Sequence, residues 1–187
     1  MCFLHSETVF IEAKFEEIVV PLVWEKQTFD NKISNETKNQ MWSFTDKGNR
    51  EVTLIPEVTG IIQEQYDLDW IKSKKKPIKL FYVSKCFRYE KPQAGRYREF
   101  TQFGIEILGD TSGQDKELAI SLLKKCLDSL TIDYDFAIVP RALGYYTEDG
   151  FEASSNSLGA QKQIAGGGRY PQGIGWAIGV DRVMLLI

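Results

Sequence analysis

The chain has 187 residues, of which 43% are hydrophobic and 12% aromatic, and its formal net charge is −3. This length and composition suffice for one substantial core, so we expect a single domain spanning residues 1–187. The negative net charge excludes a protein that holds nucleic acid through a global positive field, and any contact with RNA requires a local basic patch.

The spacing of apolar residues predicts short helices and paired strands. Residues 8–20 indicate a short helix that runs into a β-branched strand start, and residues 31–40, rich in Asn, Lys and Glu, are typical of a mobile connector. Strands are predicted at residues 42–46, 51–54, 80–87, 98–108, 135–139 and 150–154. Helices are predicted at residues 59–71 and 115–130 and at the apolar end of 173–187, which begins as a loop. This pattern predicts an α+β fold, with a mainly antiparallel β-sheet flanked by helices.

Residues 87–109 predict two strands joined by a charged loop. The alternation of the second strand divides it into one face with Thr101, Phe103, Ile105 and Ile107 and another with Phe100, Gln102, Gly104 and Glu106. We expect the first face to be core and the second to line a site. A mid-strand glycine has no side chain to pack, so Gly104 indicates that another group approaches the sheet there. Taken alone, a solvated hairpin with salt-bridged charges also fits this segment.

The cysteines and the lengths of the apolar runs indicate in which cellular compartment the protein resides. The three cysteines, at positions 2, 86 and 126, are odd in number and lack metal-like spacing, which is typical of free thiols in a reducing compartment. We therefore expect a cytoplasmic protein with no zinc or other protein-bound metal. The chain shows no signal-peptide pattern and no apolar run near the roughly 18 residues needed to span a bilayer, which predicts no membrane association.

Residues 87–109, with Phe-Arg-x-Glu followed by Arg-x-x-x-Phe, resemble motif 2 of class II aminoacyl-tRNA synthetases, in the form found in histidyl-tRNA synthetases. Residues 53–59 (Thr-Leu-Ile-Pro-Glu-Val-Thr) are similar to the family's loop that holds the amino group of the amino acid. Residues 141–146 and 165–170 resemble its two histidine-specific signatures, and residues 175–182 resemble motif 3. The resemblance covers nearly the whole chain. It implies a class II synthetase fold, activation of histidine to histidyl-adenylate, and transfer to tRNA(His).

The resemblance implies that ATP and Mg²⁺ are cofactors and assigns roles around the nucleotide. Arg88 would contact the α-phosphate, Arg96 the outer phosphates, and Glu90 the adenine amino group, while Phe100 and Arg182 would stack on the two faces of adenine. Guanidinium groups suit such a site because their rigid fork matches phosphate oxygens and keeps its charge.

Arg88 and Arg141 are the catalytic arginines that the resemblance implies. Arg141 stands in the first histidine-specific signature, at a place where related synthetases use a magnesium ion. Outside that signature, an arginine after Val139 and Pro140 is more typical of a surface charge.

The resemblance also implies a histidine pocket. An imidazole needs a carboxylate for one ring N–H and a partner for the other nitrogen, and the α-ammonium needs acceptors. Glu106 and Tyr146 would bind the ring, and Tyr145 is either a pocket wall or core. The α-ammonium would be held by Glu57, Thr59 and Gln102. Gly167, within the glycine triplet 166–168, would let the backbone close over the substrate, although a glycine triplet alone also fits an ordinary turn.

The match departs from the family at two residues and in length. Gly144 replaces an aspartate, which we expect to loosen the pocket, and Ile55 replaces an arginine, which we expect to weaken the support of Glu57. Residues 109–141 leave room for one helix and one strand where full enzymes carry an insertion domain, and we expect no anticodon-binding domain. The interpretation is a trimmed or minimal catalytic core.

Three functions stay open at this point. The first is a histidine–tRNA ligase that binds histidine and ATP, and tRNA(His) in its full-length form, as a homodimer. The second is a non-catalytic regulatory subunit of ATP phosphoribosyltransferase. Five retained residues argue against it: Arg88, Gln102, Glu106, Arg141 and Arg182. The third is a tRNA-independent amino-acid ligase, which Gly144 leaves open.

Overall fold

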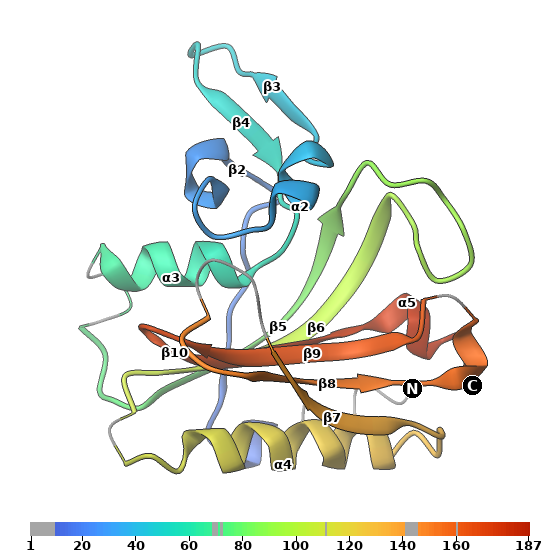
Figure 1. The fold of residues 1–187 in the computed structure, drawn as a ribbon. Helices are drawn as coiled ribbons and strands as arrows, with labels where there is room; N and C mark the ends of the chain where they lie inside the picture. The colour runs from blue at the N-terminus through green and yellow to red at the C-terminus, as the bar shows by residue number, and fades with distance from the viewer. Residues whose placement is uncertain (1–9, 69–70, 72, 111, 141–145, 160) are drawn as a thin grey trace.

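The structure is a computed structural model that describes residues 10–68, 71, 73–110, 112–140, 146–159 and 161–187. Its centre is a seven-stranded sheet in the order β1-β5-β6-β10-β9-β8-β7 (Figure 1). The strands are β1 (Glu16–Glu17), β5 (Ile78–Phe87), β6 (Glu99–Leu108), β7 (Asp135–Val139), β8 (Gly150–Ser154), β9 (Gln163–Tyr170) and β10 (Gly173–Gly179). Neighbouring strands are antiparallel, except that β1 and β5 are parallel. The fold is thus a mixed α/β arrangement around a large, mostly antiparallel sheet, as predicted.

Two hydrophobic clusters lie on opposite faces of this sheet. Helix α4 (Asp115–Asp128) runs below the sheet (Figure 1) and contributes Leu123 and Leu127 to the lower cluster. Helix α3 (Thr59–Asp67) lies above it and contributes Ile61 and Ile62 to the upper cluster. Each fully buried side chain of this size stabilises the fold by about 1.5–3 kcal/mol. The two helices therefore hold the sheet between them.

A second, three-stranded antiparallel sheet, in the order β2-β4-β3, stands above the main sheet (Figure 1). It consists of β2 (Val23–Glu25), β3 (Ser43–Thr45) and β4 (Glu51–Leu54), with the 3-10 helix η1 (Lys26–Phe29) and the short helix α2 (Asn35–Asn39) beside it. Asp46 closes the β3–β4 turn because its carboxylate accepts the backbone N–H groups of Gly48 and Arg50 and pairs with the Arg50 guanidinium. The two strands predicted around this turn are confirmed.

The β5–β6 hairpin confirms the predicted division into a core face and a site face. Phe103 and Ile105 lie in the lower cluster, whereas Gln102 lines a cleft on the upper side. The group that approaches Gly104 is the ring of Tyr82, since a Cβ atom at position 104 would lie 2.5 Å from that ring. Glycine at this position therefore makes room for a protein side chain.

Residues 31–40 differ from the predicted connector because they contain helix α2. The Ser34 Oγ accepts the backbone N–H of Thr37 at 3.1 Å and so caps the start of the helix. Such a cap satisfies one of the free N–H groups of the first turn, typically contributing about 1 kcal/mol. Composition alone gave no indication of this local bond.

The C-terminal segment also differs from its prediction. Residues 173–179 form β10 instead of a loop. The glycine triplet lies inside β9, which excludes the alternative of an ordinary turn. Glycine has a low intrinsic strand propensity, but β10 pairs with both β6 and β9, so tertiary pairing outweighs local preference. Helix α5 (Val180–Val183) follows, and a short 3-10 helix, η2 (Asn156–Leu158), lies between β8 and β9.

At the N-terminal end, β1 covers Glu16–Glu17 alone, and residues 18–20 lie beyond it. The Ile18 N–H still donates to the Phe81 carbonyl at 2.9 Å, which continues the contact with β5. In the part of the chain that the structure describes, no helix is long and apolar enough to cross a membrane.

Candidate active site

An open cleft of about 270 Å³ on the upper face of the main sheet brings together most of the residues that the sequence indicates. Strands β6, β9 and β10 contribute to its floor, and residues 32–34 and 37 contribute to its wall. The predicted residues that line it are Glu57, Thr59, Arg88, Glu90, Arg96, Phe100, Gln102, Tyr146 and Arg182. Residues from motifs far apart in the sequence therefore share one cleft.

At one end of the cleft, two arginines are each paired with another side chain, Arg88 with Phe100 and Arg96 with Glu90. Arg88 donates from Nε to the Pro56 carbonyl at 3.0 Å, and its guanidinium carbon lies 5.2 Å from the centre of the Phe100 ring. Arg96 forms an ion pair with Glu90, whose side chain is almost fully buried. These two pairs hold the groups predicted to bind ATP.

Arg182 completes this end of the cleft from helix α5. Its Nε donates to the Gly95 carbonyl at 2.8 Å and its Nη1 to the Gln163 carbonyl at 2.6 Å. Burial and the nearby positive charges of Arg88 and Arg96 lower the pKa of Arg182. Guanidinium groups that repel one another in a partly buried place are suited to a ligand with several negative charges.

Glu106 does not line the cleft but lies fully buried beneath its other end. The Thr59 hydroxyl donates to its Oε1 at 2.6 Å and the Tyr170 hydroxyl to its Oε2 at 2.5 Å. Glycine is required opposite, because a Cβ atom at Gly175 would lie 1.8 Å from Glu106 Oε2. Burial raises the pKa of Glu106 to about 8, an effect that outweighs the two hydroxyl donors. A ligand that offers an N–H group or a positive charge favours the ionised carboxylate.

Glu57 and Gln102 also line the cleft. The Glu57 Oε1 accepts the Gly60 N–H at 2.8 Å, and burial raises the pKa of Glu57 against this bond and the charge of Arg88. The Cys86 thiol donates to the Gln102 Oε1 at 3.3 Å. Ile55, which replaces the family's arginine, is fully buried in the upper cluster, so the Gly60 backbone provides a direct support for Glu57.

The glycines of β9 face different sides of the sheet. Gly166 and Gly168 line the cleft, and a Cβ atom at Gly168 would lie 2.7 Å from the Tyr146 ring. At Gly167, a Cβ atom would lie 2.5 Å from Trp176 Cβ and 2.9 Å from the Phe151 ring. The structure therefore does not bring Gly167 into the cleft, because successive residues of a strand point to opposite faces. The predictions for Arg141 and Tyr145 lie outside the described residues.

Sequence reasoning missed Tyr170 and the wall formed by Ile33, Ser34 and Thr37. A signal for Tyr170 was available, since it lies two residues after Gly168 and thus on the same strand face. The wall gave no comparable signal because its position depends on how residues 31–40 fold back over the sheet. Among the described residues, no group of three His, Cys, Asp or Glu side chains could hold a metal ion.

The raised pKa of Glu106 predicts a pH dependence of stability. Its value in the fold, about 8, exceeds the ordinary value of 4.5. The protonated form is thus favoured by folding, and its contribution is complete below about pH 4.5 and is lost as the pH rises to about 8. We expect the unfolding free energy of the wild type to fall, relative to that of Glu106→Gln, across this interval. Urea unfolding of both proteins at several pH values measures it, and a constant difference would contradict the prediction.

Comparison with solved structures defines the class of this fold. A histidyl-tRNA synthetase from S. aureus aligns with a TM-score of 0.79 and 25% identity over 99% of this chain and 64% of that chain. A pyrrolysyl-tRNA synthetase from Desulfitobacterium hafniense aligns with a TM-score of 0.78 and 16% identity, over 98% of this chain and 67% of that one. The second likeness shows the fold alone. The fold is of the class II aminoacyl-tRNA synthetase type.

Sequence comparison then gives the family. The profile of the histidyl-tRNA synthetase family matches residues 7–138. A histidine–tRNA ligase from Sulfolobus acidocaldarius is 39% identical over 141 residues, 75% of this chain and 33% of the relative. One from Clostridioides difficile is 29% identical over 280 residues, 92% of this chain and 67% of the relative. The chain belongs to the histidyl-tRNA synthetase family, and it spans about one third of the length of the Sulfolobus relative.

Proposed function

We propose that this protein activates histidine with ATP and transfers the histidyl group to tRNA(His). The observation that carries the proposal is the division of one cleft into two ends. Three arginines and Glu90 line one end, and Glu57, Thr59 and Tyr170 line the other. The buried carboxyl group of Glu106 lies beneath that second end, bonded to Thr59 and Tyr170. A nucleotide polyphosphate and an amino acid with a basic ring have the complementary charges.

The activation step joins these two ligands. A carboxylate oxygen of histidine attacks the α-phosphorus of ATP, the bond from that phosphorus to the bridging oxygen breaks, and pyrophosphate leaves with the bonding electrons. Arg88 stabilises the charge on the α-phosphate, Arg96 and Arg182 hold the outer phosphates, and Phe100 and Glu90 receive adenine. Arg141 is assigned to stabilise the same charge on the α-phosphate, because it begins the histidine-specific signature of residues 141–146. Mg²⁺ enters bound to ATP, as part of the substrate.

Histidine selection belongs to the other end of the cleft. Glu106 accepts a ring N–H and Tyr146 bonds the second ring nitrogen, whereas Glu57, Thr59 and Gln102 surround the α-ammonium. Because Thr59 already donates to Glu106, the amino-group loop and the ring-binding carboxylate are joined before the substrate arrives. Such preorganisation reduces the cost of ordering the site on binding.

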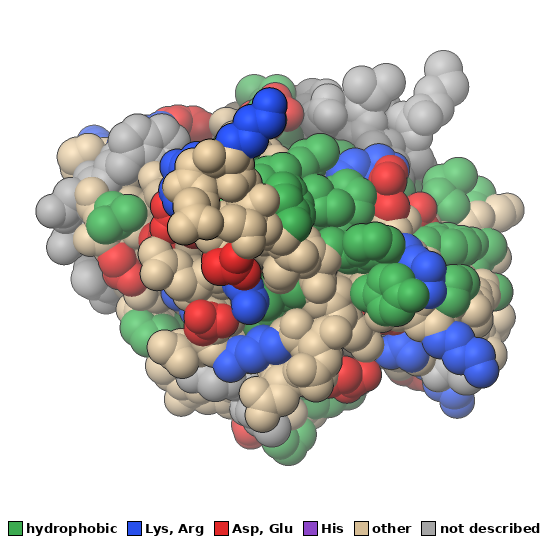
Figure 2. Space-filling model, turned by 90° about the horizontal axis from the view of Figure 1, so that it is seen from above, with side chains coloured by type: hydrophobic (Ala, Val, Ile, Leu, Met, Phe, Trp, Pro, Cys, Tyr) green, Lys and Arg blue, Asp and Glu red, His purple; other side chains and the backbone are tan. Residues whose placement is uncertain are grey.

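A homodimer and a cytoplasmic location complete the proposal. Large hydrophobic residues remain exposed on and beside the β2-β4-β3 sheet, including Leu22, Val23, Trp42 and Phe44. Figure 2, which looks down on that side, shows hydrophobic side chains gathered into a broad patch with basic side chains next to it. A patch of this kind is typical of a protein interface, and light scattering measures whether two copies associate. The buried thiols of Cys86 and Cys126 fit a reducing compartment.

Exchange of labelled pyrophosphate into ATP tests the proposed activation. We expect exchange that depends on histidine and is absent with the other amino acids, and charging of a tRNA(His) transcript in a second assay. The two assays together separate the alternatives. A regulatory subunit catalyses no pyrophosphate exchange, whereas a tRNA-independent ligase catalyses exchange without charging tRNA. A folded sample that shows no exchange with any amino acid would exclude an adenylate-forming enzyme.

A further inference from the structure

Arg169 ties three separate segments together on the lower side of the sheet. From β9, its guanidinium forms two parallel hydrogen bonds with Asp115, Nη1 to Oδ2 at 2.8 Å and Nη2 to Oδ1 at 2.5 Å. Its Nε donates to the Glu148 carboxylate at 3.2 Å, which also accepts from Lys116 Nζ at 3.1 Å. The side chain thus joins β9, the start of α4 and the segment that precedes β8.

The Asp115 bond is the strongest part of this network. Asp115 is 1% exposed and is the first residue of α4, where its Oδ1 also accepts the Lys116 N–H at 2.9 Å. A carboxylate at a helix N-terminus that accepts a bidentate arginine is held in one orientation. The Glu148 and Lys116 side chains are more than 30% exposed, so water screens their pair and weakens it. Arg169 is therefore anchored mainly through Asp115.

The backbone of Arg169 connects this anchor with the cleft. Its carbonyl accepts the Thr147 N–H at 2.9 Å, so the residue that follows Tyr146 is bonded directly to β9. The Tyr146 ring packs against Gly168, the neighbour of Arg169, and lines the cleft on the upper side of the sheet. Residues 147 and 148 are thus held by Arg169, through its carbonyl and its side chain respectively.

We propose that Arg169 is a positioning residue for histidine recognition, which acts by fixing Tyr146 against Gly168 at the amino-acid end of the cleft. The expected effect on the KM for histidine rests on the proposed function. Arg169 is not one of the described residues that line the cleft; it holds the segment from which Tyr146 reaches the ring of the substrate. Asp115, on the far side of the sheet, is the fixed point of this arrangement.

Arg169→Lys tests the role because it keeps the positive charge and removes the bidentate fork. We expect the KM for histidine in pyrophosphate exchange to rise roughly tenfold and the KM for ATP to change less than twofold, on the scale typical of coupled neighbouring residues. In a Tyr146→Ala background, the same substitution should leave the KM for histidine unchanged. Equal changes in both KM values, or additive effects of the two substitutions, would overturn the inference.

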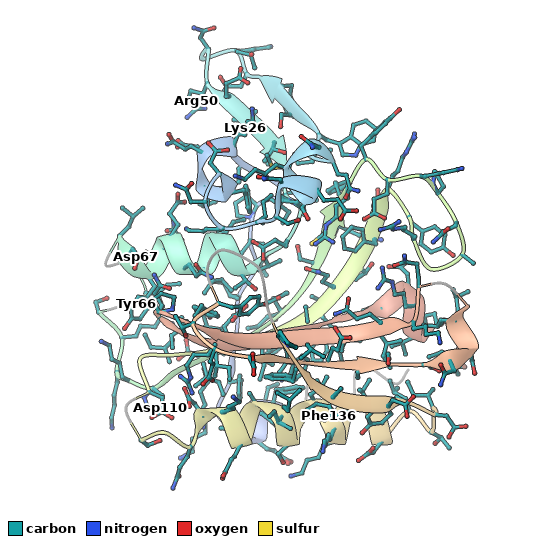
Figure 3. All side chains as sticks on the ribbon, in the orientation of Figure 1. Lys26, Arg50, Tyr66, Asp67, Asp110 and Phe136 are labelled. Carbon is teal, nitrogen blue, oxygen red and sulfur yellow. The ribbon has the colours of Figure 1, made fainter. Side chains whose placement is uncertain are left out.

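Arg50→Lys is the matched control. Arg50 also pairs with an aspartate, its Nε donating to Asp46 Oδ2 at 2.8 Å. Figure 3 shows it at the tip of the upper hairpin, at the opposite end of the molecule from Phe136, which lies beside α4. We expect Arg50→Lys to leave both KM values unchanged, because its segment does not reach the cleft.

Hydrogen exchange tests the positioning independently of catalysis. In Arg169→Lys, the amides of residues 147–150 should exchange several-fold faster than in the wild type, while those of β3 and β4 keep their rates. Unchanged exchange of residues 147–150 would overturn the positioning role whatever the protein activates. Absence of exchange of pyrophosphate in the wild type, with faster amide exchange in the variant, would reject the proposed function and keep the positioning role.

Discussion

Replacing Glu106 by glutamine is expected to weaken histidine binding roughly 10- to 100-fold while leaving ATP affinity unchanged. Glu106 is fully buried between the hydroxyls of Thr59 and Tyr170, two residues that line the cleft above it. A hydrogen bond to a charged partner contributes about 1.5–3 kcal/mol, and the neutral amide cannot supply it. Calorimetric titration with histidine, and separately with an ATP analogue, measures both affinities.

The pH dependence of histidine binding gives this prediction a second arm. The pKa of Glu106 is raised to about 8, and that of a free imidazole is about 6.5. Between these two pH values we expect the carboxyl group and the imidazole together to carry one proton, which they share in a hydrogen bond. Affinity should therefore be highest between these values and fall on both sides. In Glu106→Gln the decline above about pH 8 should disappear. Unchanged histidine affinity, or the same upper limb in both proteins, would refute the assignment.

Arg88→Ala is expected to slow adenylate formation by about 100- to 1,000-fold, the usual cost of removing one group that stabilises transition-state charge. Arg88 is fixed by its bond to the Pro56 carbonyl and by the Phe100 ring, so its guanidinium is preorganised at the arginine end of the cleft. We expect histidine affinity to stay within a few fold of the wild type. Single-turnover formation of histidyl-adenylate measures the rate.

Lys85→Ala provides the control for Arg88→Ala. Lys85 lies on β5, three residues before Arg88, which directly follows that strand, and its exposed side chain pairs with Glu99 at 3.3 Å. Removing an exposed charge of this kind costs little, so the rate should be unchanged. A similar loss of rate in both variants would indicate a general disturbance of β5 and would contradict a specific role of Arg88.

Local sequence pattern was most informative where side chains alternate along a strand. The separation of Phe103 and Ile105 from Gln102 and Glu106 followed from the two-residue period of β6 and is found in the structure. Helix α4 was predicted within two residues of its end because its apolar positions recur at helical spacing. In both cases, the information lies in neighbouring residues.

The local sequence pattern was misleading where a strand pairs with a segment that lies far away in the sequence. The glycine-rich residues 163–170 and 173–179 become strands through pairing with each other and with β6. Gly167 was assigned to the pocket as one member of a triplet, although its place in β9 turns it toward Trp176 and the core. Such faces are fixed by strand register, which a stretch of glycines does not reveal.

The sequence by itself determined the family, most of the residues that meet in the cleft, and the division of β6 into a core face and a site face. Only the tertiary structure decided that Tyr170 shares Glu106 with Thr59, that residues 32–34 and 37 form a wall of the cleft, and that Arg169 pairs with Asp115 on the lower side of the sheet. The physical reason is the separation along the chain between the residues in contact. Periodicity and motif order record how each segment meets its own neighbours, whereas these contacts arise when packing brings together residues that are distant along the chain.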